Sequence, residues 1–89
     1  MKKVRFTKSF DKHFKVRVSN NENLKRRFDD RFQDFIAGRP GHPLDDHPLG
    51  GVLKGKRAFS ITGDIRVVYE IDGDCCVFLD IGTHNQVYR

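Results

Sequence analysis

The sequence predicts an α+β fold in which two N-terminal helices pack on one face of a small, mostly antiparallel, twisted sheet. Two observations lead to this prediction. The first half of the chain has one short alternating stretch and then two stretches with apolar residues at helical spacing. The second half has three short apolar stretches separated by turn signals. The expected order is therefore β-α-α-β-β-β, and the 89 residues suffice for one core, so we expect residues 1–89 to form a single domain.

The chain begins with a predicted strand and a first helix. Residues 3–6 alternate basic and apolar side chains, as in a half-buried strand. Thr7 is a suitable helix cap, and Phe10 and Phe14 follow one turn apart on one face. His13 lies among lysines in this helix, so we expect its side chain to be exposed to solvent.

The second predicted helix carries an apolar stripe. Asn20 or Asn21 is expected to cap it, and Gly38 is a C-terminal stop signal. The apolar positions recur at helical spacing, and they are Leu24, Phe28, Phe32 and Phe35 or Ile36. We interpret this stripe as core packing.

A long loop and three strands complete the prediction. Residues 38–55 hold all three prolines and five of the eight glycines, so we expect neither helix nor strand there. Residues 56–62, 65–71 and 75–81 are the predicted strands, and the last of them is nearly all apolar, which indicates a central position. In the predicted strand 56–62, Ala58 and Ser60 lie on the face opposite Phe59. We expect that face of the sheet to be open, with Ser60 and Arg66 on it.

The composition limits the classes of function. The net charge is +5 and the isoelectric point is near 9.5, which is typical of proteins that meet polyanions or an acidic partner. No apolar run approaches the roughly 18 residues of a membrane span, and the basic N-terminus lacks a signal-peptide core, so we expect a cytoplasmic protein with no membrane contact. Cys75 and Cys76 are adjacent, which favours neither a disulfide nor a zinc site. The spacing of histidines and carboxylates favours no metal, and no motif indicates a cofactor.

One group of polar residues in the second half suits chemistry on a phosphate. Cations can stabilise charge on a phosphate, a histidine can move protons near neutral pH, and a tyrosine can stack on a base. This combination suits metal-free RNA cleavage, in which a 2′-OH attacks the adjacent phosphorus. A basic binding patch without turnover remains the alternative. The group consists of Lys54, Lys56, Arg57, Arg66, Asp64, His84 and Tyr88.

The same residues form a pattern that resembles a known family. The pattern runs His47-Pro48-Leu49-x-Gly51-x-x-Lys54-Gly55-x-Arg57, then Asp64 and Tyr69, then Gly82-Thr83-His84-x-x-x-Tyr88. It is similar to the YafQ branch of the RelE/ParE toxin superfamily. The resemblance implies a RelE-like fold and the toxin of a bacterial type II toxin–antitoxin system. Such a toxin is a metal-independent, ribosome-dependent endoribonuclease, or mRNA interferase, that cuts messenger RNA in the ribosomal A site.

The resemblance also implies roles for residues. His84 would be the general acid or base, Asp64 would orient His84 or act as the base, and Tyr88 would stack on or position the nucleotide. His47 would support the site or touch ribosomal RNA. Ser60 stands where the family has a histidine, and Ile65 where it has a tryptophan.

The strand after the turn adds an arginine to this set. Residues 63–70 are similar to a strand of the RelE branch whose arginine contacts the scissile phosphate, so Arg66 would bind the phosphate with Lys54 and Arg57. Other cations are expected to serve ribosomal RNA docking, namely Lys8, Lys12, Lys25, Arg26 and Arg27.

Three alternatives remain open at this point. The chain could be a ParE-like gyrase inhibitor, a catalytically degenerate toxin that acts as an antitoxin- or RNA-binding module, or a general RNA-binding protein. Both toxin interpretations imply a cognate antitoxin in a hetero-oligomer. An acidic, partly disordered antitoxin would suit the basic surface.

Overall fold

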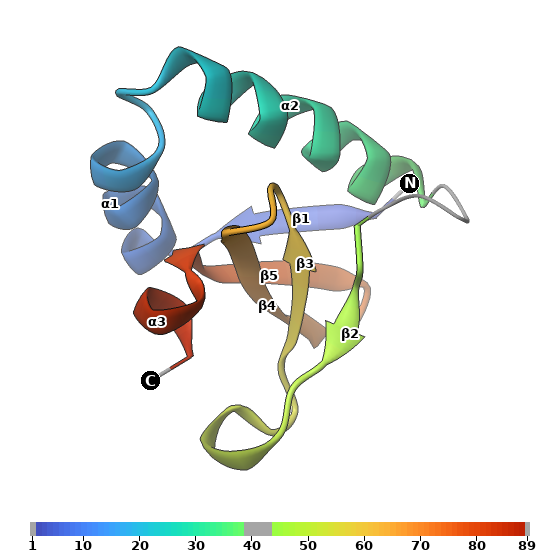
Figure 1. Cartoon of the computed structure of the whole chain (residues 1–89). Coiled ribbons are helices and arrows are strands. Elements are labelled where there is room, and N and C mark those ends of the chain that lie inside the picture. Colours follow the sequence, from blue (N-terminus) through green and yellow to red (C-terminus); the bar gives the residue numbers. More distant parts are fainter. Residues whose placement is uncertain (1, 39–43, 89) are drawn as a thin grey trace.

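The computed structural model of the protein describes residues 2–38 and 44–88. Figure 1 shows the predicted order of elements, with additions in the second half. The elements are β1 (Lys3–Phe6), α1 (Lys8–Arg17), α2 (Glu22–Ala37), β2 (His47–Pro48), a 3₁₀ helix η1 (Gly51–Leu53), β3 (Arg57–Ser60), β4 (Ile65–Asp72), β5 (Cys75–Thr83) and α3 (His84–Val87).

The predicted helix boundaries are confirmed by their caps. The Thr7 hydroxyl accepts a hydrogen bond from the N–H of Phe10 and donates one to the Phe78 carbonyl, so it ties the start of α1 to β5. Asn21 caps α2 by accepting from the N–H of Leu24. Gly38 ends α2 in the left-handed conformation with φ 64°, which a residue with a Cβ rarely adopts.

The strands form one mostly antiparallel sheet in the order β1-β5-β4-β3-β2. β1 pairs with β5 in parallel, and the other neighbours are antiparallel. The predicted interior position of β5 is therefore confirmed. Val68 pairs with Asp80 and Tyr69 with Phe78, which leaves Leu79 as the extra residue of a β-bulge.

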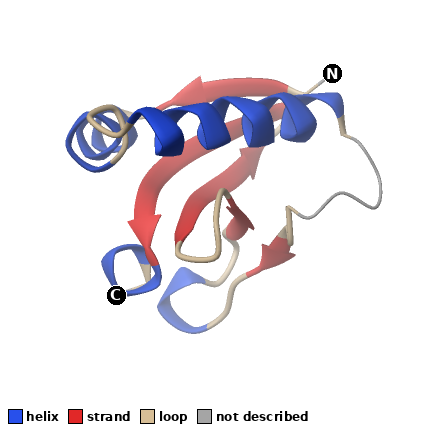
Figure 2. Ribbon diagram, turned by 45° about the horizontal axis from the view of Figure 1, so that its top comes forward, coloured by secondary structure: helices blue, strands red, loops and turns tan. Residues whose placement is uncertain are grey.

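One face of the sheet packs against α1 and α2, and we call it the helix-covered face (Figure 2). Phenylalanines of both helices meet sheet residues there, and Phe35 stacks on Phe59 with ring centroids 4.5 Å apart. Phe78 is fully buried and contacts rings from both helices. The phenylalanine stripe of α2 is thus core, as its spacing predicts.

The opposite face, which we call the second face, is less open than we expect from the sequence. Ala58 and Val68 are buried there beneath Val87 of α3. Leu49 and Tyr88 pack around them. The expectation of an uncovered face is therefore wrong, because the chain turns back over the sheet after β5.

The predicted loop also needs a correction. Its residues 39–43 lie outside the described part of the chain, but β2 and η1 both fall within the rest of it. β2 forms because His47 and Pro48 pair with Ala58 and Arg57 at the edge of the sheet, where proline is tolerated. No helix among residues 2–38 and 44–88 is long and apolar enough to cross a membrane.

Candidate active site

Two of the candidate residues are positioned by the short helix α3. Thr83 and Gln86 form a capping box, in which the Thr83 hydroxyl accepts from the N–H of Gln86 and the Gln86 side chain accepts from the N–H of Thr83. His84 is the first residue of the helix and is exposed. Tyr88 follows one turn later, and the two rings meet edge to face with centroids 4.5 Å apart. The local sequence therefore fixes both side chains as one unit.

The Tyr88 hydroxyl is buried, and two groups of opposite charge act on its pKa. Among the described residues it has no hydrogen-bond partner. Burial raises its pKa, Arg66 opposes that shift and Asp45 adds to it. The hydroxyl thus lies within electrostatic reach of Arg66 and Asp45, and it stays protonated at neutral pH.

Arg66 lies on the second face between two neighbouring strands. It pairs with Ser60 of β3 on one side and with Gly82 of β5 on the other. Ser60 belongs to the same face as Ala58, as its strand parity predicts. A Cβ at position 82 would come within 2.6 Å of the Gln86 side chain and 2.8 Å of Arg17, so glycine lets α3 approach the sheet next to Arg66.

Asp64 lies in the turn between β3 and β4. The Thr62 hydroxyl accepts hydrogen bonds from the N–H groups of Asp64 and Ile65, which shapes this turn. The Asp64 residue is exposed. Because Ile65 pairs with Thr83, the residue before Ile65 and the residue after Thr83 meet at the same end of the sheet. This register brings Asp64 and His84 to one edge of the site.

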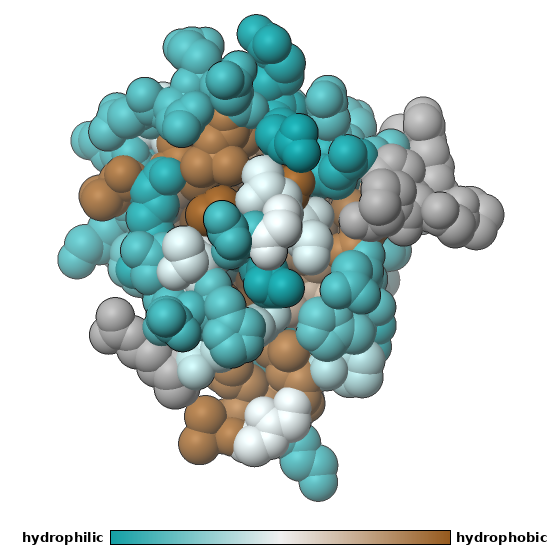
Figure 3. Space-filling model, viewed as in Figure 1, coloured by the Kyte–Doolittle hydropathy of each residue, from teal (hydrophilic) through white to brown (hydrophobic). Residues whose placement is uncertain are grey.

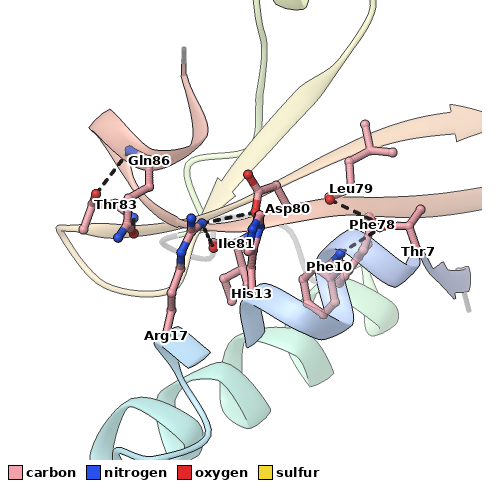
Figure 4. A network of polar contacts seen from close by, with 10 residues as sticks. All are labelled: Thr7, Phe10, His13, Arg17, Phe78, Leu79, Asp80, Ile81, Thr83 and Gln86. Atoms are coloured by element: carbon pink, nitrogen blue, oxygen red, sulfur yellow. Dashed lines mark hydrogen bonds and ion pairs between the residues drawn. The ribbon is translucent and has the colours of Figure 1, made fainter. Parts of the chain in front are cut away.

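A polar network fastens the end of β5 to α1 (Figure 4). His13 Nδ1 lies 2.6 Å from Asp80 Oδ1, and Arg17 Nη1 donates to the same oxygen at 3.3 Å. Arg17 also donates to the carbonyl of Ile81 at 2.9 Å. His13 is therefore half-buried and not exposed as the sequence predicts, because its ring contacts the Asp80 carboxylate. The network holds the strand that leads into α3.

Arg57 lies apart from this site, on the helix-covered face. Its Nε donates to Asp46 at 3.1 Å and to the Tyr69 hydroxyl at 3.2 Å, and that hydroxyl donates to Asp46 at 2.6 Å. Burial and the Asp46 carboxylate raise the pKa of Tyr69 above its usual range. The structure thus separates Arg57 from Arg66, although the sequence prediction grouped them.

His47 shares the second face with Arg66, whereas Lys54 and Lys56 lie before the start of β3. His47 pairs with Ala58, so it faces the same side of the sheet as Arg66, and its Nδ1 donates to the Asp45 carbonyl at 2.7 Å. Lys54 is exposed at the end of η1, and Lys56 is half-buried. Both lysines precede β3, whereas Ser60 ends it, so they lie toward the opposite end of that strand (Figure 1).

Within residues 2–38 and 44–88, no three His, Cys, Asp or Glu side chains lie close enough together to hold a metal ion. Cys75 and Cys76 are both free thiols. On the second face Arg66, His84, Tyr88 and Asp64 provide a guanidinium, an imidazole, a phenol and a carboxylate.

Comparison with known proteins places the chain among the toxins of bacterial type II toxin–antitoxin systems. The family model described as the bacterial toxin of type II toxin–antitoxin systems, YafQ, matches residues 2–89. The chain therefore belongs to the YafQ toxin family, as the sequence motifs indicate. No curated protein matches the chain in sequence.

Solved structures support the same fold. A point mutant of YafQ from E. coli is 19% identical, with a TM-score of 0.82 and all of both chains covered. YafQ in the E. coli DinJ–YafQ complex is 20% identical, with a TM-score of 0.80 and all of both chains covered. A metal-bound toxin from Helicobacter pylori is 29% identical, with a TM-score of 0.77, covering 98% of this chain and 99% of the other.

Proposed function

We propose that this YafQ-family toxin is a ribosome-dependent endoribonuclease that cuts messenger RNA in the ribosomal A site. The observation that carries the proposal is the joint placement of Arg66, His84 and Tyr88 on the second face. The His84 ring meets the Tyr88 ring edge to face, and the charge of Arg66 lowers the pKa of the Tyr88 hydroxyl against the effect of burial. A cation and an exposed imidazole on the same face of the sheet suit a reaction in which charge develops on a phosphate.

The proposed reaction needs no metal. The 2′-oxygen of the ribose attacks the adjacent phosphorus, and the bond from phosphorus to the 5′-oxygen of the next nucleotide breaks. The products are a 2′,3′-cyclic phosphate and a 5′-hydroxyl. A base must take the 2′-OH proton, and an acid must give a proton to the leaving oxygen.

The residues of the second face supply these roles in our proposal. His84 acts as general acid or base, and Asp64 orients His84 or takes the complementary role. Arg66 stabilises the negative charge on the phosphorane-like transition state. Tyr88 positions the nucleotide through its ring, which is already held by Ala58, Val68 and Val87.

Ser60 stands where the family pattern has a histidine, so this site has one proton-transfer group fewer. It faces the same side as Arg66 and pairs with it across the strands. A serine hydroxyl can donate a hydrogen bond to a phosphate but does not exchange protons near neutral pH as a histidine does. We therefore assign proton transfer to His84 and Asp64, and phosphate contact to Ser60 and Arg66.

The remaining predicted residues fit substrate and ribosome contacts. His47 shares the second face, and Lys54 and Lys56 lie toward the far end of β3. In our proposal they bind RNA outside the cleaved phosphate. Arg57 donates hydrogen bonds to Asp46 and Tyr69 and stabilises the fold.

We also propose a cognate antitoxin as the resting partner. E. coli YafQ, which shares this fold, has been solved in a complex with DinJ. The net charge of +5 favours an acidic antitoxin that covers the basic surface in a hetero-oligomer. A toxin that acts on ribosomes would work in the cytoplasm.

The test is cleavage in a reconstituted translation reaction, with new RNA ends mapped by primer extension. We expect cuts at A-site codons that require ribosomes and fall at least about 100-fold in His84→Ala. Intact messenger RNA and unaffected translation with the wild-type chain would overturn the proposal. A gyrase supercoiling assay on the same preparation would then separate a gyrase inhibitor from a binding module.

A further inference from the structure

A polar pocket lies beside the proposed active site, where the tip of the β3–β4 hairpin meets α2. Its volume is about 370 Å³. In Figure 3 hydrophilic and neutral residues cover the middle of the molecule, over this hairpin. Residues of the loop, the hairpin and α2 line the pocket, among them Arg27, Arg31, Asp45, Ser60, Thr62 and Arg66.

The pocket carries an excess of positive charge. Arg27 and Arg31 are four residues apart on α2, so their side chains project from the same side of the helix. Arg66 adds a third guanidinium from the sheet, and Asp45 contributes one carboxylate. Arg31 also contacts Asp34 at 3.1 Å. Among the described residues that line the pocket there are three arginines and one aspartate, so the pocket favours an anion although Asp34 also contacts Arg31.

The pocket shares two residues with the proposed active site, and this indicates which anion it binds. Arg66 and Ser60 belong to both, so the two sites have a common wall. An RNA strand that places one phosphate on Arg66 carries its next phosphate one nucleotide away. Guanidinium groups match the geometry of phosphate oxygens and can bind them through two parallel hydrogen bonds.

We propose that Arg27 and Arg31 bind the RNA phosphate next to the one that is cleaved. The substrate is then held at two phosphates, one on Arg66 and one on α2. This inference rests on the proposed function for the identity of the cleaved phosphate. Arg27 thereby becomes a substrate-binding residue rather than part of a general docking surface.

The test uses two RNA probes that cannot be cleaved. A 2′-O-methyl trinucleotide has two internucleotide phosphates, and the matching dinucleotide has one. Each is titrated into ¹⁵N-labelled protein at low salt, and the Nε–Hε signals of Arg27 and Arg31 are followed. The variant is Arg27→Gln, because Arg27 is exposed and its replacement spares the core.

The matched control is Arg26→Gln. Arg26 is also an exposed arginine of α2, but it lines a different pocket with Glu22, Lys25 and Asp29. We expect Arg27→Gln to weaken trinucleotide binding about 3- to 10-fold and dinucleotide binding less than about twofold. Arg26→Gln should change neither. The dependence of trinucleotide affinity on salt should also fall by about 0.7 in log–log slope in Arg27→Gln.

Several results would overturn the inference. One is a wild-type chain that does not bind the trinucleotide, and another is an Arg27→Gln variant that loses affinity for both probes equally or for neither. If Arg27→Gln instead weakens only the binding of a ten-residue glutamate peptide, the pocket serves an acidic protein. None of these readouts needs catalysis. The two proposals can therefore fail separately. If the wild-type chain does not cut messenger RNA on ribosomes but Arg27→Gln still weakens trinucleotide binding alone, the proposed function is refuted and the phosphate-binding site on α2 is supported.

Discussion

The two faces of the sheet differ in whether their polar side chains are paired by hydrogen bonds. On the helix-covered face Arg57, Asp46 and Tyr69 satisfy one another through three hydrogen bonds. On the second face the Tyr88 hydroxyl is buried without a hydrogen-bond partner among the described residues, and His84 is exposed. Buried polar groups are normally paired, since an unpaired one costs about 1–3 kcal/mol. The polar groups of the helix-covered face thus contribute to stability, whereas in our proposal those of the second face are left for a ligand.

Neighbouring residues of β5 give the sharpest stability contrast between the faces. Phe78 is fully buried on the helix-covered face, whereas Leu79 is half-buried on the second face. We expect Phe78→Ala to lower the free energy of unfolding by about 3–5 kcal/mol, because it leaves a large cavity among aromatic rings. Leu79→Ala should cost only about 1–2 kcal/mol. Urea unfolding followed by circular dichroism measures both, and equal losses would break the distinction between the faces.

The two tyrosines offer a second contrast. Tyr69→Phe removes the donor to the Asp46 carboxylate, so we expect a loss of about 1.5–3 kcal/mol in the free energy of unfolding. Tyr88→Phe removes a buried hydroxyl with no hydrogen-bond partner among the described residues, so it should cost no stability and should raise the free energy of unfolding by up to about 1–3 kcal/mol. Urea unfolding followed by circular dichroism measures the free energy of unfolding of both variants. A larger loss in Tyr88→Phe than in Tyr69→Phe would contradict the assignment of their roles.

The raised pKa of Tyr69 predicts a weakness at alkaline pH. Its pKa is raised above the ordinary value of 10.0 in the folded chain, mainly by burial, so the folded state keeps a proton that the unfolded state loses. Stability from this group is present below pH 10 and declines above it, by about 1.4 kcal/mol per pH unit. Unfolding measured between pH 9 and 11 should show a shallower decline in Tyr69→Phe. An unchanged decline would assign the effect to other groups.

Most of the scaffold can be predicted from the sequence, because its signals are local. Helical spacing and capping residues give α1 and α2, and alternation with turn residues gives β3, β4 and β5. The helix α3 is too short for a periodicity signal, but Thr83 and Gln86 have the spacing of a capping box and could have revealed it. β2 depends on pairing with β3 and has no local signal of its own.

For the site, too, some placements can be predicted from local sequence patterns and others depend on long-range contacts. Strand parity places Arg57 on the side of Phe59 and Arg66 on the side of Ser60, so the sequence alone could have separated the two arginines. The contact between His13 and Asp80 could not be predicted. It joins residues 67 positions apart in the chain, from α1 and β5. Pairings of this kind need the register of the whole sheet.

The most direct test of the account compares Arg66→Gln with Arg57→Gln in ribosome-dependent cleavage and in thermal unfolding. Both variants remove one guanidinium from neighbouring strands, on opposite faces of the sheet. We predict that Arg66→Gln loses about 10²–10³ in cleavage rate and keeps its unfolding temperature. Arg57→Gln should lose about 1–2 kcal/mol in stability, since it leaves Asp46 and Tyr69 incompletely paired, and should keep its cleavage rate while folded. The reverse pattern, with cleavage lost in Arg57→Gln and kept in Arg66→Gln, would contradict the claim that the second face carries the function.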